Sequence, residues 1–120
     1  MAQVALDAAI KIKKKYNIEV GVCHFSTIKP LDKIMLKKII KKSEKVVPIE
    51  ENVKEGGFGS SILEFMSSLN QSKKCDVRIF GLRSSFSKKY GTQQEILHDN
   101  NLQDDYLSKK MYRFILNDRF

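Results

Sequence analysis

The chain has 120 residues, of which 42% are hydrophobic and 30% are charged, and its formal net charge is +8. This length and balance predict one compact domain with a single core, with little room for a large enzyme's whole active site and its cofactor. No apolar run approaches the roughly 20 residues that a membrane span requires, so no membrane partner is expected. At the N-terminus the charges follow the apolar residues, which is not the order of a signal peptide.

The positive charge has two interpretations. A surplus of 22 Lys+Arg over 14 Asp+Glu could indicate a nucleic-acid partner. The surplus is mostly lysine, spread over several segments, and Trp is absent, which favours solvated helix faces instead. No nucleic-acid partner is therefore expected. Cys23 and Cys75 are far apart without zinc-type spacing, and they predict buried thiols in a reducing compartment.

Two helices and a strand are predicted in the first third of the chain. Residues 2–15 form a helical pattern with an apolar face of Val4, Ala5, Ala8, Ala9 and Ile12. Residues 18–25 read as a strand. Residues 33–42 predict a helix with Asp32 as its N-cap and an inward face of Ile34, Met35 and Ile39, together with Leu31.

The middle of the chain predicts a strand followed by a helix. Residues 45–51 predict a short strand whose centre, Val46 to Ile49, is apolar throughout, as expected for a strand covered on both faces. Pro48 has no amide donor, so it should lie near an edge or at the strand end. After a group of glycines, an amphipathic helix is indicated by Ile62, Phe65, Met66 and Leu69 at spacings of three and four.

The last third predicts a strand at residues 75–82, a loop at 83–91, a short helix at 92–100 capped by Thr92, and a final helix at 102–116. The inward face of that final helix is predicted to contain Leu107, Met111, Phe114 and Ile115. Alternating helices and strands of this kind predict an α/β fold with a mostly parallel sheet flanked by helices. Because the series opens on a helix, a first strand is expected to be missing from it.

The segment from Glu50 to Ser61 is the candidate site. Its residues of interest are Glu50, Glu51, Gly56, Gly57, Phe58, Gly59, Ser60 and Ser61. A dinucleotide fingerprint would need a third glycine at position 62, and no Gly-Lys-Ser/Thr follows. The amides at Gly59–Ser61 would open a helix, where an anion or regulatory ligand could bind. The alternative is a turn whose glycines allow positive φ and close packing.

Glu50 and Glu51 do not form a convincing acid–base pair. Adjacent residues in a strand point to opposite sides. One carboxylate is therefore expected to cap nearby amides, while the other is solvated or meets a neighbouring domain. His24 and His98 lie apart, and no nucleophile–base constellation is present, so no catalytic, cofactor-binding or metal-binding residue is assigned.

Three linked motifs resemble the C-terminal domain of the transketolase superfamily. They are Lys29-Pro30-Leu31-Asp32, Glu50-Glu51 and Gly56-Gly57-Phe58-Gly59, in the order and spacing of that superfamily. The first helix is also similar to the first helix of the family, which normally follows a strand. The resemblance covers nearly the whole chain.

The tail is most similar to the 1-deoxy-D-xylulose-5-phosphate synthases. The matching positions are Gly81, Leu82, Phe86, Gly91, Gln94 and the run Asn101-Leu102-Gln103. The chain departs from that pattern at Arg83, Ser84 and Tyr90, and upstream at His24 and Ser26. A 2-oxoacid dehydrogenase beta chain or a transketolase is the alternative within the superfamily, and a stand-alone anion-binding regulatory module is the alternative outside it.

The resemblance implies that residues 1–120 are one domain of a longer, thiamine-diphosphate-dependent transferase. That parent would condense pyruvate with glyceraldehyde 3-phosphate for isoprenoid and thiamine synthesis. Thiamine diphosphate and Mg2+ would be bound by preceding domains, so the isolated chain is expected to be inactive. The expected partners are those domains and a second copy in a homodimer, in the bacterial cytoplasm or in a plastid-type organelle (the apicoplast) of a parasite.

Overall fold

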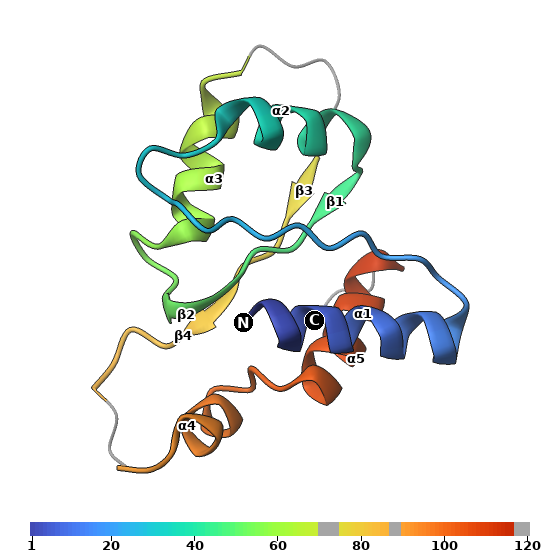
Figure 1. Cartoon of the computed structure of the whole chain (residues 1–120), viewed down its shortest axis with the longest axis vertical. Coiled ribbons are helices and arrows are strands. Elements are labelled where there is room, and N and C mark those ends of the chain that lie inside the picture. The colour runs from blue at the N-terminus through green and yellow to red at the C-terminus, as the bar shows by residue number, and fades with distance from the viewer. Residues whose placement is uncertain (70–74, 87–89, 117–120) are drawn as a thin grey trace.

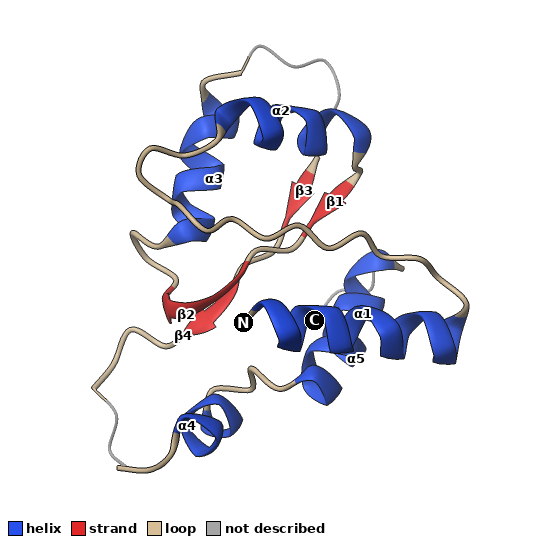
Figure 2. Ribbon diagram, viewed as in Figure 1, coloured by secondary structure: helices blue, strands red, loops and turns tan. Residues whose placement is uncertain are grey.

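The computed structural model describes residues 1–69, 75–86 and 90–116. Helices and short strands alternate through most of the chain, and the helices flank the strands on two sides (Figures 1 and 2). In chain order the elements are α1 (Ala2–Tyr16), α2 (Lys33–Lys42), β1 (Lys45–Val46), β2 (Ile49–Val53), α3 (Phe58–Ser67), β3 (Asp76–Val77), β4 (Phe80–Leu82), α4 (Gln93–Asp99) and α5 (Asp104–Ile115).

The strands form one parallel ribbon in two stretches. β1 pairs with β3, and β2 pairs with β4, both in parallel. Backbone hydrogen bonds join the two stretches, since the Phe80 amide donates to the Pro48 carbonyl at 2.9 Å. Pro48 lies between β1 and β2, which confirms its predicted place at a strand end. The predicted parallel α/β arrangement is therefore present, as short two-stranded pairs.

The α1–α5 core, named for its two main helices, lies on one side of the ribbon. Its fully buried members are Ala8, Ile12, Leu102, Leu107 and Met111. Half-buried side chains of the ribbon and of α1 pack against it, including Val4, Ile49 and Phe80. The faces predicted for the first and last helices are confirmed, since Ala8, Ile12 and Leu107 are buried.

The α2–α3 core lies on the other side and consists of Leu36, Ile40, Ile62 and Cys75. The inward face predicted for α2 was wrong at Ile34 and Met35, whereas Leu31 packs against this core as predicted and Ile39 is half-buried. Ile34 is 74% exposed and Met35 is 44% exposed, while Leu36 and Ile40 are almost fully buried. Two overlapping apolar stripes exist on this helix, and its packing against α3 and Cys75 selects the one that contains Leu36 and Ile40.

Residues 18–25, predicted as a strand, belong to no strand. This segment crosses in front of the ribbon in Figure 1 and connects the two cores. Ile18 and Val20 pack against the α1–α5 core and Phe25 against the α2–α3 core, but no ladder partner for this segment exists in the part of the chain that the structure describes. Cys23 is therefore exposed, contrary to prediction, whereas Cys75 is buried as predicted.

Local capping signals were predicted correctly. The Asp32 carboxylate accepts a hydrogen bond from the Met35 amide at 2.9 Å and begins α2. Thr92 begins α4 in a full capping box with Glu95. Part of the predicted loop at 83–91, residues 87–89, lies outside the described residues. Among the helices of the described ranges, none combines the length and apolar character needed to cross a bilayer.

Candidate functional site at the end of β2

An irregular stretch of β2 places the two glutamates. Ile49 is in register with Phe80, and Val53 is in register with Leu82, so β2 contains two more residues than β4 between these pairs. Such an irregularity redirects the side chains within it. Glu50, only 7% exposed, turns toward the start of α3, while Glu51 is exposed.

Glu50 caps helix α3 from a distance in sequence. Its Oε2 accepts from the Phe58 amide at 2.7 Å, and its Oε1 accepts from the Gly59 amide at 3.0 Å. The N-cap residue is Gly57, which has no side chain to serve these first amides. A carboxylate at a helix N-terminus is stabilised by both the unpaired amides and the helix dipole. The prediction that one glutamate caps nearby amides is confirmed for Glu50.

Ser60 closes the turn between β2 and α3. Its hydroxyl donates to the Lys54 carbonyl at 2.8 Å and accepts from the Gly56 amide at 3.0 Å. Gly56 has a φ of 74°, a conformation that favours glycine. The Ser61 hydroxyl donates back to the Gly57 carbonyl at 3.2 Å. The polar groups of the turn are thus largely engaged with one another.

Gly57 and Gly59 allow the backbone to approach its neighbours closely. A Cβ at Gly57 would overlap the Glu50 carboxylate and lie 2.6 Å from the Val53 carbonyl oxygen. A Cβ at Gly59 would lie 2.6 Å from side-chain atoms of Ile79. These two glycines therefore allow the close packing that the turn interpretation requires. An external anion at the Phe58 and Gly59 amides would have to displace Glu50.

Glu51 connects β2 to helix α4. The Gln93 side-chain amide Nε2 lies 2.8 Å and 2.9 Å from the two carboxylate oxygens of Glu51. The adjacent glutamates thus serve different elements on opposite sides of the strand. Each carboxylate therefore has its own hydrogen-bond partners, the Phe58 and Gly59 amides for Glu50 and the Gln93 side chain for Glu51.

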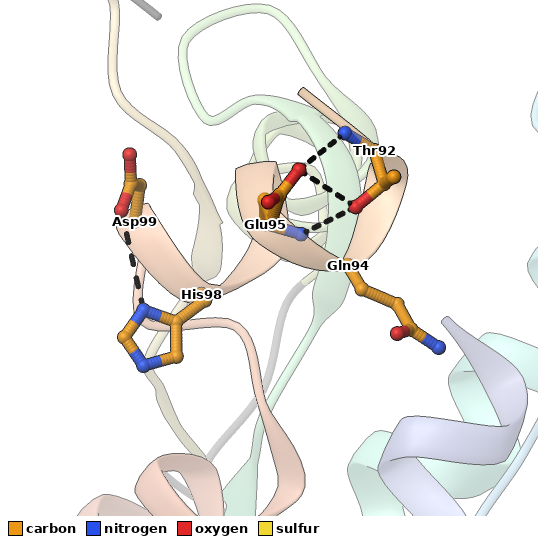
Figure 3. A pocket seen from close by; sticks show the side chains of 5 residues that line it. All are labelled: Thr92, Gln94, Glu95, His98 and Asp99. Carbon is orange, nitrogen blue, oxygen red and sulfur yellow. Dashed lines mark hydrogen bonds and ion pairs between the residues drawn. The ribbon is translucent and has the colours of Figure 1, made fainter. Parts of the chain in front are cut away.

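An open hollow of about 400 Å³ lies along α4 (Figure 3). Two of its lining side chains, Thr92 and Glu95, form the capping box at the start of α4. The Thr92 hydroxyl and amide both lie within 3.0 Å of the Glu95 Oε2, and the Thr92 amide that donates there lowers the pKa of Glu95. His98 Nδ1 is 4.0 Å from an Asp99 oxygen, and the His98 side chain is 77% exposed. His24 is also exposed and far from this hollow in sequence. We assign no catalytic role to either histidine.

Sequence reasoning missed contacts that depend on distant residues. The Lys45 ammonium donates to the Phe114 and Ile115 carbonyls at 2.6 Å and 2.7 Å, and so caps the C-terminus of α5. Lys11 on α1 forms ion pairs with Asp104 and Asp105 at the start of α5. The hydrogen bond from Lys11 lowers the pKa of Asp104 below its ordinary value of 3.8. A run of lysines gives no local signal for such pairings.

No cluster of three or more His, Cys, Asp or Glu side chains suited to a metal ion occurs within residues 1–69, 75–86 and 90–116. The carboxylates of the candidate site are engaged in capping and docking. The donor set of the site therefore does not fit a Mg2+ centre, and no chemical step is assigned to these residues.

Curated relatives share the sequence over much of this chain. A 1-deoxy-D-xylulose-5-phosphate synthase of Francisella tularensis subsp. holarctica is 36% identical over 110 residues, which are 92% of this chain and 17% of that protein. The synthase of Clostridium kluyveri is 41% identical over 86 residues, 72% of this chain and 13% of that protein. The synthase of Clostridium perfringens is 40% identical over 74 residues, 62% of this chain and 12% of that protein. The chain thus spans less than a fifth of their length.

A solved structure supports the same fold. It is described as a split gene transketolase, inactive beta4 tetramer, and it matches 98% of this chain and 37% of its own with a TM-score of 0.82 and 24% identity. The family model for the transketolase C-terminal domain matches residues 1–101, which include the Lys29–Asp32, Glu50-Glu51 and glycine motifs. The chain belongs to the transketolase C-terminal domain family.

Proposed function

We propose that residues 1–120 are the C-terminal domain of a longer 1-deoxy-D-xylulose-5-phosphate synthase. The observation that carries this proposal is the similarity to such synthases over as much as 92% of the chain, at 36% identity. Within the proposal, the domain packs on the other domains of the enzyme and takes part in forming a homodimer. It contributes no catalytic group, and the domains that precede it hold thiamine diphosphate and Mg2+.

In the proposed parent enzyme, pyruvate loses CO2 and its remaining two carbons join glyceraldehyde 3-phosphate to give 1-deoxy-D-xylulose 5-phosphate. The product would feed isoprenoid and thiamine synthesis. We place the enzyme in the bacterial cytoplasm, because the relatives described above are bacterial. An apicoplast location would require a parasite source.

The segment Glu50–Ser61 is proposed as an interface loop instead of a catalytic one. Its internal bonds fix the entry to α3, and exposed Glu51 is already used to dock another element. Exposed apolar side chains on two helices, Ile34 and Met35 on α2 and Leu63 on α3, offer surface for neighbouring domains. A charge at Ile34 in the parent enzyme is expected to weaken its assembly, measurable by sedimentation velocity.

The decisive test of the proposal is the coding sequence upstream of Met1. An open frame that encodes a Gly-Asp-Gly…Asn thiamine diphosphate motif would support the longer synthase. A start codon at Met1 with no such frame would instead favour the stand-alone anion-binding module. A frame that encodes a 2-oxoacid dehydrogenase beta chain or a transketolase would agree with the family assignment but would contradict the proposed synthase activity.

A second test addresses the chain itself. Calorimetric titration with thiamine diphosphate and Mg2+ should give no saturable heat with the purified 120-residue chain. Tight, Mg2+-dependent binding would contradict the assignment of the cofactor to other domains. Enzymatic turnover by the chain alone would contradict it as well.

A further inference from the structure

A second cleft, of about 260 Å³, lies at the carboxyl ends of β2 and β4. Lys54 directly follows β2, and Arg83 directly follows β4, so the parallel pairing brings both to one edge. The α4–α5 connection and the first turns of α5 also line the cleft. Ligands of parallel α/β folds commonly bind outside the carboxyl ends of the strands.

The side chains that line this cleft are strongly biased in charge. Four of them are cationic, namely Lys54, Arg78, Arg83 and Lys110, and none of the described lining residues carries a carboxylate. Arg78 and Lys110 lie over aromatic rings, at 4.9 Å from the Phe114 ring and 5.4 Å from the Tyr106 ring. These contacts hold the two cations in place along the cleft.

Two of these cations, Lys54 and Arg83, have no partner among the described residues. Neither the Lys54 ammonium nor the Arg83 guanidinium forms an ion pair or hydrogen bond within residues 1–69, 75–86 and 90–116. Arg83 is nevertheless anchored, since its amide donates to the Asn100 Oδ1 at 3.3 Å. Like-charged side chains gathered around one hollow repel each other unless an anion lies between them.

The geometry points to a binding site for a phosphate-class anion in this cleft, held by Lys54 and Arg83 with Arg78 and Lys110 alongside. A guanidinium offers paired donors that match phosphate oxygens, and an ammonium adds a point charge. Asn100, Asn101 and Tyr106 contribute further polar groups to the lining. The volume is below that of sites for drug-sized ligands, which fits a small anion or the phosphate end of a metabolite.

This site differs from the helix start at Phe58 and Gly59, whose amides are already bonded to Glu50. The cleft is lined by Lys54 after β2, by β4 and the residues on either side of it, by the α4–α5 connection and by α5. It also does not depend on the identity of the longer enzyme. If the coding sequence upstream of Met1 lacks the thiamine diphosphate motif, the proposed anion site is unaffected. If the cleft binds no anion, the proposed function is unaffected.

The test is a titration of the 15N-labelled full chain with inorganic pyrophosphate, followed by amide chemical shifts. Saturable shifts are expected at Lys54, Arg83, Asn100 and Asn101. The double variant Lys54→Gln/Arg83→Gln should weaken binding by about tenfold or more, since charge-assisted bonds are lost. Glutamine keeps much of each side chain's length, and far-UV circular dichroism will confirm that the variant is folded.

The matched control is Lys37→Gln/Lys38→Gln, which removes the same charge from the exposed face of α2. Its affinity for pyrophosphate should change by less than about twofold, as expected for a screened, distant effect. Equal losses in the two double variants would overturn the site in favour of non-specific attraction. Absence of saturable shifts at millimolar pyrophosphate, shifts centred on residues 58–61, or equally tight binding of citrate would overturn it too.

Discussion

The two cores of the molecule differ in the interactions that stabilise them and in how well the sequence predicts which helix faces they bury. The α1–α5 core combines apolar packing with polar connections, because Lys11 pairs with Asp104 and the Tyr16 and Tyr112 rings stack with centroids 3.5 Å apart. The α2–α3 core is apolar, and the start of α3 depends on a single carboxylate, Glu50. Helices with one apolar stripe reveal their inward face, whereas α2 has two candidate stripes and needs its neighbours to choose.

The largest expected effect tests which face of α2 is buried. Ile40→Ala removes a fully buried side chain from the α2–α3 core and should lower the free energy of unfolding by about 3 kcal/mol. Ile34→Ala, the same change on the exposed face of the same helix, should cost less than about 0.5 kcal/mol. Urea denaturation of both variants measures the difference. A larger loss for Ile34→Ala than for Ile40→Ala would mean that the sequence-based face was correct.

The next effect separates the two glutamates. Glu50→Ala leaves the Phe58 and Gly59 amides without their acceptor and should destabilise the chain by about 2–3 kcal/mol. Glu51→Ala loses only exposed bonds to Gln93 and should stay within about 0.5 kcal/mol of the parent. Urea denaturation again provides the measurement. Loss of stability in the Glu51 variant alone would contradict the capping role of Glu50.

A smaller effect concerns the close approach of α3 to the ribbon. Gly59→Ala forces a methyl group against Ile79 and should cost about 1–3 kcal/mol, in the range of overpacked cores. Gly21→Ala is the control, because nothing lies within 4 Å of a Cβ at that position. Thermal unfolding should show a lower midpoint for Gly59→Ala than for Gly21→Ala. Identical midpoints would show that α3 can shift away from Ile79 without cost.

The smallest effect tests the ion pair between Lys11 and Asp104, which connects α1 to α5. The folded pKa of Asp104 is lowered by Lys11, so this pairing stabilises the fold above the unfolded pKa of Asp104 and is lost as pH falls through the folded value. The pKa of Lys11 is raised above 10.5, so its contribution is lost at strongly alkaline pH. Lys11→Met should therefore flatten the acid side of the stability profile.

The measurement for that pair is urea denaturation of the parent and Lys11→Met at pH 7 and at acid pH. The parent should lose more stability than the variant on acidification. Lys14→Met, at an exposed position on the same helix, is the control and should follow the parent. Parallel profiles for the parent and Lys11→Met would show that solvent screens the pair completely.

Local and periodic features of this protein were determined by the sequence itself. Asp32 and Thr92 start their helices because their side chains reach amides three residues ahead, and Pro48 interrupts the ribbon because it has no amide hydrogen. The linked motifs around Glu50-Glu51 and the glycines were enough to predict the family, which the family model confirms.

Only the tertiary structure decided the features that depend on residues far apart in the chain. It left residues 18–25 without a ladder partner among the described residues, since strands form only where another backbone supplies the hydrogen bonds. It turned Glu50 inward and Glu51 outward through the irregular stretch of β2. It also gathered Lys54, Arg78, Arg83 and Lys110 around one cleft, although the sequence shows them only as scattered charges.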